Sequence, residues 1–116
     1  ECVVRQFNGY EVLPGLTING KLTLGENIAD LGGLLMAYEA FQRSRQGKPA
    51  ETIDGFTPEQ RFFLGYARIW AGKYRPEALR SQVLGDPHSN GMFRVNGPLS
   101  NLEEFRKAFG CQEGDK

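Results

Sequence analysis

Residues 23–46 constrain the fold of this chain most, because they predict one long helix of a particular kind. Thr23 and Glu26 have the spacing of a capping box, in which two side chains satisfy backbone N–H groups at a helix start. Gly47 predicts where the helix ends. Glu26 and Asp30 stand one turn apart, so they share a face of this helix.

The face that carries these two acids is otherwise built from very small residues. At 100° per residue, the stripe contains Glu26, Ala29, Asp30, Gly33, Ala37 and Ala40. Small side chains let another backbone approach closely, and two carboxylates in such a seam are costly unless a positive group meets them there. A metal ion with histidine ligands is one such group. The other side of the helix predicts an apolar face, made of Ile28, Leu31, Leu35 and Tyr38.

The remaining sequence predicts a mainly α fold with about four helices in all. A second capping box begins at Thr57, a short helix is expected over residues 75–84, and a third capping box at Ser100 starts the last helix. Residues 1–22 predict an irregular or short β segment, and residues 85–99, rich in glycine, proline and asparagine, predict a long loop. The aromatic centre of the core is expected from Phe62, Phe63, Tyr66, Ile69 and Trp70.

Charge and composition exclude several classes of function. The chain has 14 Lys plus Arg and 14 Asp plus Glu, so its near-zero net charge argues against nucleic acid or an anionic membrane as the main partner. No apolar run reaches the roughly 18 residues of a membrane span. A length of 116 residues predicts one domain. Cys2 and Cys111 lie near opposite ends of the sequence, which by itself does not show that they meet.

Nearly the whole sequence resembles the neprilysin-like zinc metallopeptidases, of the neprilysin, endothelin-converting-enzyme and PepO type. The stretches that carry the resemblance are Gly25-Glu26-Asn27-Ile28-Ala29-Asp30-x-Gly32-Gly33, Tyr74-Arg75-Pro76-Glu77, Asp86-Pro87-His88-Ser89, Phe93-Arg94-Val95-Asn96-Gly97 and Phe105-x-x-Ala108-Phe109. His88 is the single histidine, and the sequence contains no His-Glu-x-x-His. The resemblance therefore implies that residues 1–116 are the C-terminal part of a zincin-type catalytic domain, with the His-Glu-x-x-His part upstream.

The resemblance implies a role for each polar residue of interest. Glu26 would be a zinc ligand, and Asp30 would orient one upstream histidine ligand. His88 would stabilise the oxyanion of the tetrahedral intermediate, and Arg94 would hold a substrate carbonyl. Judged by spacing alone, the ordinary alternatives are a capping glutamate, a solvated first-turn aspartate, an exposed loop histidine and a surface arginine.

The resemblance also adds Ile69 and Trp70 to substrate binding. In the family, the matching apolar–Trp pair helps line the pocket for the residue that follows the cleaved bond, which prefers large apolar side chains. Helical spacing alone places both residues in the core. The two roles are compatible, because one face of a helix can pack while its edge borders a cleft.

At a few positions the sequence departs from the family pattern. Leu31 stands where asparagine is usual, Asn90 where proline is common, and Ala71 where animal members have a cysteine, which indicates a bacterial relative. In the disulfide-rich animal members, the cysteines matching Cys2 and Cys111 pair with others that lie outside these residues. Both are therefore expected to be free thiols here.

These inferences lead to two hypotheses. In the first, the chain is the C-terminal part of a zinc-dependent endopeptidase that hydrolyses oligopeptides, and it is inactive without the upstream part of the same polypeptide. The resemblance favours a location outside the cytoplasm for such a protein. In the second, the chain is a non-catalytic helical domain that binds a peptide or protein partner. If the small-residue face normally packs against an upstream helix, we expect the chain by itself to self-associate or to bind a hydrophobic dye.

Overall fold

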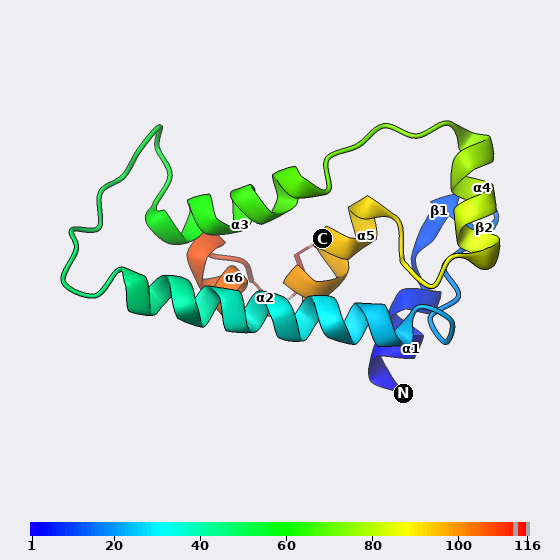
Figure 1. The fold of residues 1–116 in the computed structure, drawn as a ribbon, viewed down its shortest axis with the longest axis horizontal. Helices are drawn as coiled ribbons and strands as arrows, with labels where there is room; N and C mark the ends of the chain where they lie inside the picture. The colour runs from blue at the N-terminus through cyan, green and yellow to red at the C-terminus, as the bar shows by residue number, and fades with distance from the viewer. Residues whose placement is uncertain (113, 116) are drawn as a thin grey trace.

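The computed structural model describes residues 1–112, 114 and 115, and in this part the chain forms six helices and one two-stranded sheet (Figure 1). The elements are α1 (Cys2–Asn8), β1 (Glu11–Leu13), β2 (Leu16–Thr17), α2 (Leu24–Ser44), α3 (Pro58–Ile69), α4 (Pro76–Gly85), α5 (Gly91–Leu99) and α6 (Glu103–Phe109). The mainly α fold class is confirmed, although the number of helices exceeds the four that were expected.

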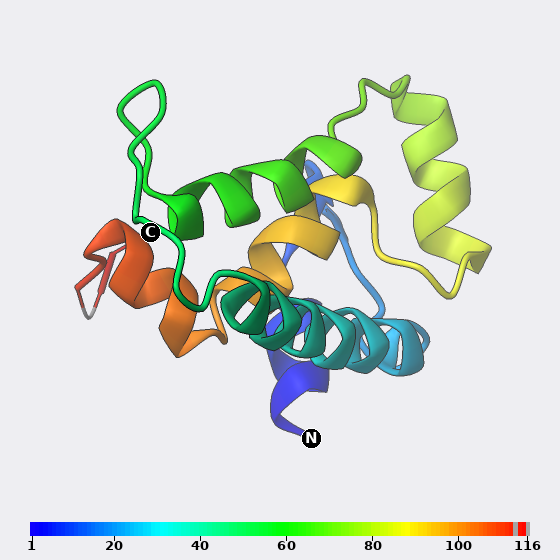
Figure 2. The same cartoon turned by 60° about the vertical axis from the view of Figure 1, so that its left-hand side comes forward.

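Helix α2 is the longest element, and it runs along the long axis of a molecule that measures 47 × 30 × 26 Å (Figure 1). Helices α1 and α5 lie against α2, α6 packs against α3, and α4 lies against the two strands. Figures 1 and 2 show α4 apart from the other helices, joined to α3 by an extended segment. No helix among the described residues has the length and apolar character needed to cross a lipid bilayer.

Two hydrophobic clusters hold these elements together. The first joins α2, α3, α5 and α6 around the buried residues Leu34, Phe63, Leu99 and Leu102. The second joins α1, the sheet and α5 around the buried residues Phe7, Ile18 and Phe93. Helix α5 contributes to both clusters, so its position relative to α2 is set from two sides.

The first residues of the chain are helical, which corrects the expectation of an irregular or β-like segment. Val3 and Val4 are β-branched and favour strands when taken alone. Phe7, however, is almost fully buried and packs edge-to-face on Tyr10, whose ring stacks on Phe93 at 4.5 Å. Burial of this aromatic side chain outweighs the weak local preference of the valines.

The short β segment that was expected does follow α1. Strands β1 and β2 are antiparallel, with Leu13 opposite Leu16. Pro14 and Gly15 form the turn between them, and the φ of +73° at Gly15 is one that other residues rarely adopt. Cys2 and Cys111 are both free thiols.

Helix α5 replaces most of the loop expected over residues 85–99. Gly97 and Pro98 lower the helix propensity of this segment, which is why the sequence predicted a loop. Pro98 sits in the last turn, and a Cβ at position 97 would come within 2.3 Å of the Phe7 ring. Glycine is therefore needed there by close helix packing, and its presence does not signal an irregular backbone.

The three expected capping boxes have different outcomes. At Thr57 the box is complete: its Oγ1 accepts from Gln60 N at 3.2 Å, and Gln60 Oε1 accepts from Thr57 N at 3.0 Å. Thr23 is the N-cap of α2 but makes no capping bond, because its hydroxyl oxygen accepts from the Asn27 side-chain amide at 2.9 Å and not from a backbone N–H group. The capping box predicted at Thr23 is wrong.

The capping box predicted at Ser100 is also wrong. Helix α6 has Leu102 as its N-cap, without a side-chain bond. The Ser100 hydroxyl instead donates to the Gly97 carbonyl at 2.9 Å, at the end of α5. The serine therefore serves the preceding helix, whose existence the sequence analysis had not predicted.

The buried face of α2 is offset from the apolar face that was expected. Ile28 and Leu35 are about half exposed, whereas Leu34 and Asn27 are buried. Helices α3, α5 and α6 contribute to the cluster around Leu34, and they approach α2 from that side. The inward stripe therefore includes a polar residue, and two large apolar residues are left at the surface.

Candidate functional site

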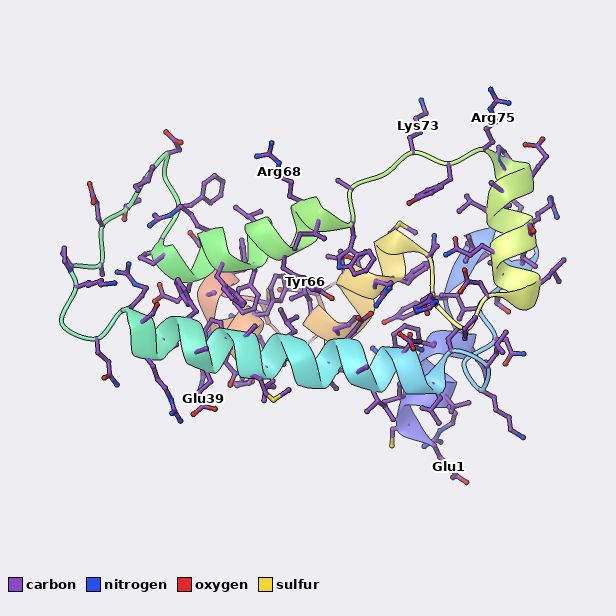
Figure 3. All side chains as sticks on the ribbon, viewed as in Figure 1. Glu1, Glu39, Tyr66, Arg68, Lys73 and Arg75 are labelled. Carbon is purple, nitrogen blue, oxygen red and sulfur yellow. The ribbon has the colours of Figure 1, made fainter. Side chains whose placement is uncertain are left out.

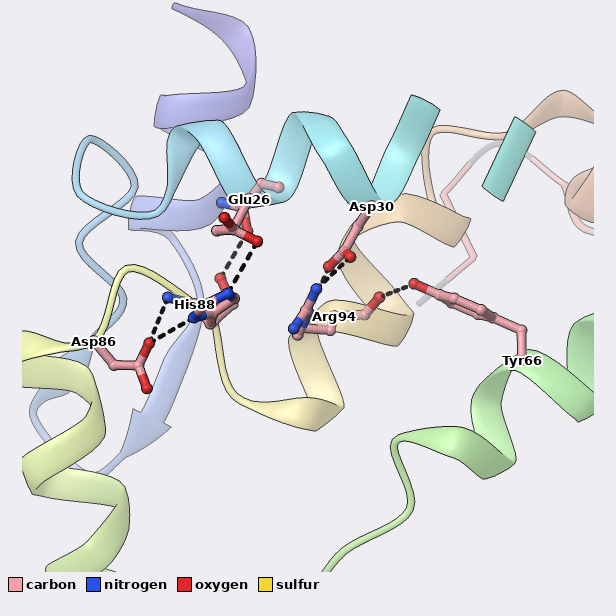
Figure 4. Close-up of polar contacts among 8 residues, drawn as sticks. Glu26, Asp30, Tyr66, Asp86, His88 and Arg94 are labelled. Carbon is pink, nitrogen blue, oxygen red and sulfur yellow. Dashed lines mark hydrogen bonds and ion pairs between the residues drawn. The ribbon is translucent and has the colours of Figure 1, made fainter. Parts of the chain in front are cut away.

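Glu26 and His88 lie far apart in the sequence but face each other in the structure. Glu26 lies in the first turn of α2, and His88 lies in the loop between α4 and α5. The Nε2 atom of His88 is 3.0 Å from Oε2 of Glu26 (Figure 4). Both side chains are partly exposed, so solvent or a ligand can reach this pair.

Asp86 contacts the opposite side of the His88 ring. Its Oδ1 accepts from the His88 backbone N–H at 2.9 Å and lies 2.8 Å from the ring Nδ1 (Figure 4). These hydrogen bonds, the backbone one first, lower the pKa of Asp86 below its ordinary value. Asp86 lies in one of the stretches that carry the family resemblance, but no role was expected for it. The signal that could have found it is the Asp-Pro-His spacing, in which an aspartate bonds a backbone N–H two residues later.

Asp30 and Arg94 form a second pair, one turn further along α2. Arg94, from α5, donates from Nε to Oδ2 of Asp30 at 2.6 Å and from Nη2 to Oδ1 at 2.5 Å. The side chains are only 16% and 11% exposed, so this is a largely buried, bidentate ion pair. Hydrogen bonding to Asp30 is the main cause that raises the pKa of Arg94. The guanidinium is thereby fixed in position and stays charged.

Two aromatic residues at the end of α3 hold Arg94 from the other side. The guanidinium carbon lies 3.9 Å from the centroid of the Trp70 ring, within range of a cation–π interaction. The Tyr66 hydroxyl donates to the Arg94 carbonyl at 2.7 Å (Figure 4). Burial raises the pKa of Tyr66. Figure 3 shows Tyr66 pointing into the molecule while Arg68 points away from it. The hydrogen bond from Tyr66 to Arg94 was not predicted, because the sequence indicated only a core position for Tyr66.

Ile69 does not join this group. It is 74% exposed, so its expected place in the aromatic core is wrong. It borders an open apolar groove of about 250 Å³ between α2 and α3. The groove is lined by Gly33, Leu34, Ala37, Phe62, Tyr66 and Ile69. Trp70, its neighbour, packs on Arg94 instead.

A buried hydrogen bond joins the two segments that carry Glu26 and His88. The Ser89 hydroxyl donates to Oδ1 of Asn27 at 2.8 Å, and the two residues are 3% and 2% exposed. No role was expected for either residue from the sequence. Each directly follows a candidate site residue, Glu26 or His88, and this position is the signal that points to them.

The donor chemistry of Glu26 suits a zinc ion, which accepts carboxylate oxygen as one ligand among nitrogen and sulfur ligands. Within the described residues, however, no group of three or more His, Cys, Asp and Glu side chains is placed to hold a metal ion. Glu26 therefore has the donor type of a zinc ligand, but the described residues do not place beside it the set of companion ligands that a zinc site needs.

Comparison with known proteins identifies the family. The model of Peptidase family M13 matches residues 1–116. Neprilysin-3 of Drosophila melanogaster is 42% identical over 100% of this chain and 15% of its own length. Endothelin-converting enzyme 1 of Rattus norvegicus is 47% identical over 98% of this chain and 15% of its own length. The chain thus spans about 15% of the length of these relatives.

A solved structure shares the fold closely. The zinc metalloprotease Zmp1 of Mycobacterium tuberculosis, in complex with inhibitor, superposes with a TM-score of 0.91 at 41% identity. The match covers 97% of this chain and 18% of that one. Because the family model spans every residue and the relatives are this similar, the chain belongs to peptidase family M13, the neprilysin-like zinc metallopeptidases.

Proposed function

We propose that this chain is the C-terminal part of the catalytic domain of a zinc endopeptidase that hydrolyses oligopeptides. The observation that carries the proposal is the pairing of α2 with the segment 86–94: Glu26 meets His88, and one turn later Asp30 meets Arg94. The upstream part of the same polypeptide supplies a His-Glu-x-x-His segment with two further zinc ligands and the general base. The chain alone is inactive in this proposal.

Glu26 is the zinc ligand that this chain provides. When bound, zinc activates water as a nucleophile and polarises the substrate carbonyl. The position of Glu26 supports the role, because its carboxylate is partly exposed at the start of α2. Among the described residues, the His88 ring is the only group that forms a hydrogen bond or ion pair with this carboxylate.

His88 is the donor that stabilises negative charge on the carbonyl oxygen. In its protonated form it donates Nδ1–H to Asp86, and this contact orients the ring so that Nε2–H points toward Glu26. A donor that is already oriented needs no reorganisation when charge develops in the transition state. The partial exposure of the His88 side chain leaves room for a substrate beside it.

Arg94 binds a substrate carbonyl, and the Asp30 and Trp70 contacts hold it in place. Its Nε and Nη2 groups are occupied by Asp30, whereas its Nη1 group makes no hydrogen bond within the described residues. Arginine has five N–H donors, so donors remain for a substrate. Asp30 also retains acceptor capacity on each oxygen, which supports its proposed second role of orienting an upstream histidine ligand.

Ile69 and Trp70 border the pocket for a large apolar side chain of the substrate. The apolar groove between α2 and α3, which Ile69 lines, supports this assignment. The exposure of Ile69 supports it as well, because 74% of a large apolar residue is left uncovered in this chain.

We place the intact protein outside the cytoplasm, as the family resemblance favours. The bacterial source expected from Ala71 is not borne out, because the relatives are mostly animal proteins, such as those of Drosophila melanogaster and Rattus norvegicus. The bacterial protein Zmp1 is found among the solved structures.

The proposal is tested on the complete gene product, including whatever the gene encodes upstream of residue 1. We expect one zinc ion per molecule and zinc-dependent hydrolysis of a fluorogenic oligopeptide, with both lost in Glu26→Ala. Glu39→Ala is the matched control, because Glu39 is an exposed carboxylate on the same helix that points away from the site (Figure 3). A Glu26→Ala protein that keeps its zinc and its turnover would overturn the proposal.

A further inference from the structure

We infer that Asn27 and Ser89 are positioning residues, whose hydrogen bond sets the placement of His88 relative to Glu26. The inference rests on the proposed function, because it assigns these two residues to the geometry of that site. Neither residue is proposed to contact the substrate or the metal. Each acts through the neighbour that precedes it in the sequence.

The bond belongs to a short chain of hydrogen bonds that runs in one direction. The Ser89 hydroxyl donates to Asn27 Oδ1 at 2.8 Å, and Asn27 Nδ2 donates to Thr23 Oγ1 at 2.9 Å. The Thr23 hydroxyl then donates to the Asn19 carbonyl at 3.1 Å. Asn27, Ser89 and Thr23 are all at most 3% exposed. Because each donor meets an acceptor, the Asn27 amide has a defined orientation and presents its oxygen to Ser89.

The Glu26–His88 contact is not expected to hold the two segments together by itself. Its side chains are 40% and 42% exposed, and exposed ion pairs contribute little because solvent screens them. The Asn27–Ser89 bond is fully buried, and breaking it leaves a buried acceptor without a partner. Since position 27 directly follows the proposed ligand and position 89 directly follows the proposed oxyanion donor, the buried bond fixes the two backbones from which those side chains extend.

The test measures steady-state kinetics of the zinc-loaded complete gene product and of Ser89→Ala. We expect kcat to fall about 10- to 100-fold, since misplacing a catalytic group by about 1 Å has an effect of that size. KM should stay within about twofold, because His88 acts on charge that develops after the substrate is bound. Ser89→Thr, which keeps the hydroxyl, should restore most of the turnover. Ser100→Ala removes a serine hydroxyl remote from this bond and should leave kcat unchanged.

A second measurement separates positioning from general stabilisation. If Ser89 acts through His88, then adding Ser89→Ala to His88→Ala should change kcat by less than about twofold, because coupled residues are not additive. Amide hydrogen exchange should also accelerate in Ser89→Ala over residues 85–92 while the middle of α2 is unaffected. This readout does not depend on activity.

The outcomes distinguish the inference from the proposed function. If His88→Ala loses activity but Ser89→Ala keeps the kcat of the unmodified protein, the positioning role of Ser89 and Asn27 is wrong, while the proposed role of His88 stands. If His88→Ala keeps full kcat, the role of His88 is wrong and the inference falls with it. Should Ser89→Ala not fold, Ser89→Cys, with its weaker donor, should show a smaller drop in kcat, and an unchanged kcat would overturn the inference.

Discussion

Arg94 makes three contacts at once, and the two made by its side chain use properties of arginine. The flat, forked guanidinium bonds both oxygens of Asp30, and its face lies against the Trp70 ring. Its backbone carbonyl accepts from Tyr66. A lysine would keep the charge but lose the paired bonds and the stacking. This residue therefore links α2, α3 and α5 at the site.

Removal of this side chain tests that link. We expect Arg94→Ala to lower the free energy of unfolding of the chain by about 3 kcal/mol, because it leaves the Asp30 carboxylate buried without a partner. Arg43→Ala is the matched control. Arg43 pairs with Glu39 on the surface, where the effect should be below about 1 kcal/mol. Urea denaturation of both variants measures the difference, and equal effects would contradict this description of the pair.

The lowered pKa of Asp86 predicts that the stability of the chain depends on pH. Its pKa in the folded state lies below its ordinary value of 3.8, so its hydrogen bonds to His88 stabilise the fold above that pH. The stabilisation is lost as the pH falls through the lowered folded-state pKa. Asp86→Asn should therefore have a lower free energy of unfolding than the unmodified chain at pH 5, and the difference between the two should shrink toward pH 3. Urea denaturation at the two pH values measures this difference. A difference that stays constant or grows toward pH 3 would contradict the stabilising role of Asp86.

For individual residues, the sequence predicted which side chains belong to the candidate site better than it predicted which residues contact them. Residue types and the family resemblance singled out Glu26, Asp30, His88 and Arg94, and the structure brings them together as two pairs. The partners Asp86, Tyr66, Asn27 and Ser89 were missed. Their contacts depend on how a loop and two helices approach one another, and the spacing of residues within one element carries no record of that.

At the scale of elements, α5 shows why a helix can be hidden from sequence reasoning. Its glycine and proline weaken the local helix signal, yet the Phe7 ring occupies the space beside Gly97 where a side chain would stand. The packing therefore requires a helical residue without a side chain at position 97. Helix propensity alone counts glycine as unfavourable there, whereas the contact with Phe7 explains why glycine is needed.

The close approach at Gly97 predicts a strong effect of a single methyl group. Gly97→Ala should lower the free energy of unfolding by about 2–3 kcal/mol, because a new Cβ would lie 2.3 Å from the buried Phe7 ring. Gly32→Ala is the matched control in α2, where nothing lies within 4 Å of the added atom. There the substitution should be neutral or should stabilise the chain by up to about 1 kcal/mol. Similar destabilisation in both variants, measured by thermal or urea unfolding, would refute the packing argument.

At the scale of the whole molecule, a large amount of apolar surface is uncovered. The large exposed apolar side chains on α2 and α3 are Ile28, Leu35, Met36, Leu64 and Ile69. The groove between these helices is also apolar. The sequence could predict the mainly α fold from helix spacing, but not which helix faces would stay open, because that depends on how the helices pack against one another.

This uncovered surface predicts the behaviour of the chain by itself. We expect the chain to self-associate with rising concentration or to bind a hydrophobic dye, and Ile69→Ser with Met36→Ser should weaken both effects. Sedimentation velocity and dye fluorescence measure them. A chain that stays monomeric at high concentration and does not raise the fluorescence of the dye would contradict the prediction that this apolar surface is available for binding.

We propose that this chain carries one part of a zinc site and that the remaining ligands come from another segment. A calorimetric zinc titration of the 116-residue chain at neutral pH, without a chelating buffer and with Glu26→Ala as the control, tests this proposal. We expect weak or absent binding in both proteins, since no group of three or more His, Cys, Asp and Glu side chains among the described residues is placed to hold a metal ion. Tight, stoichiometric binding that is lost in Glu26→Ala would contradict it, because the chain would then complete a zinc site by itself.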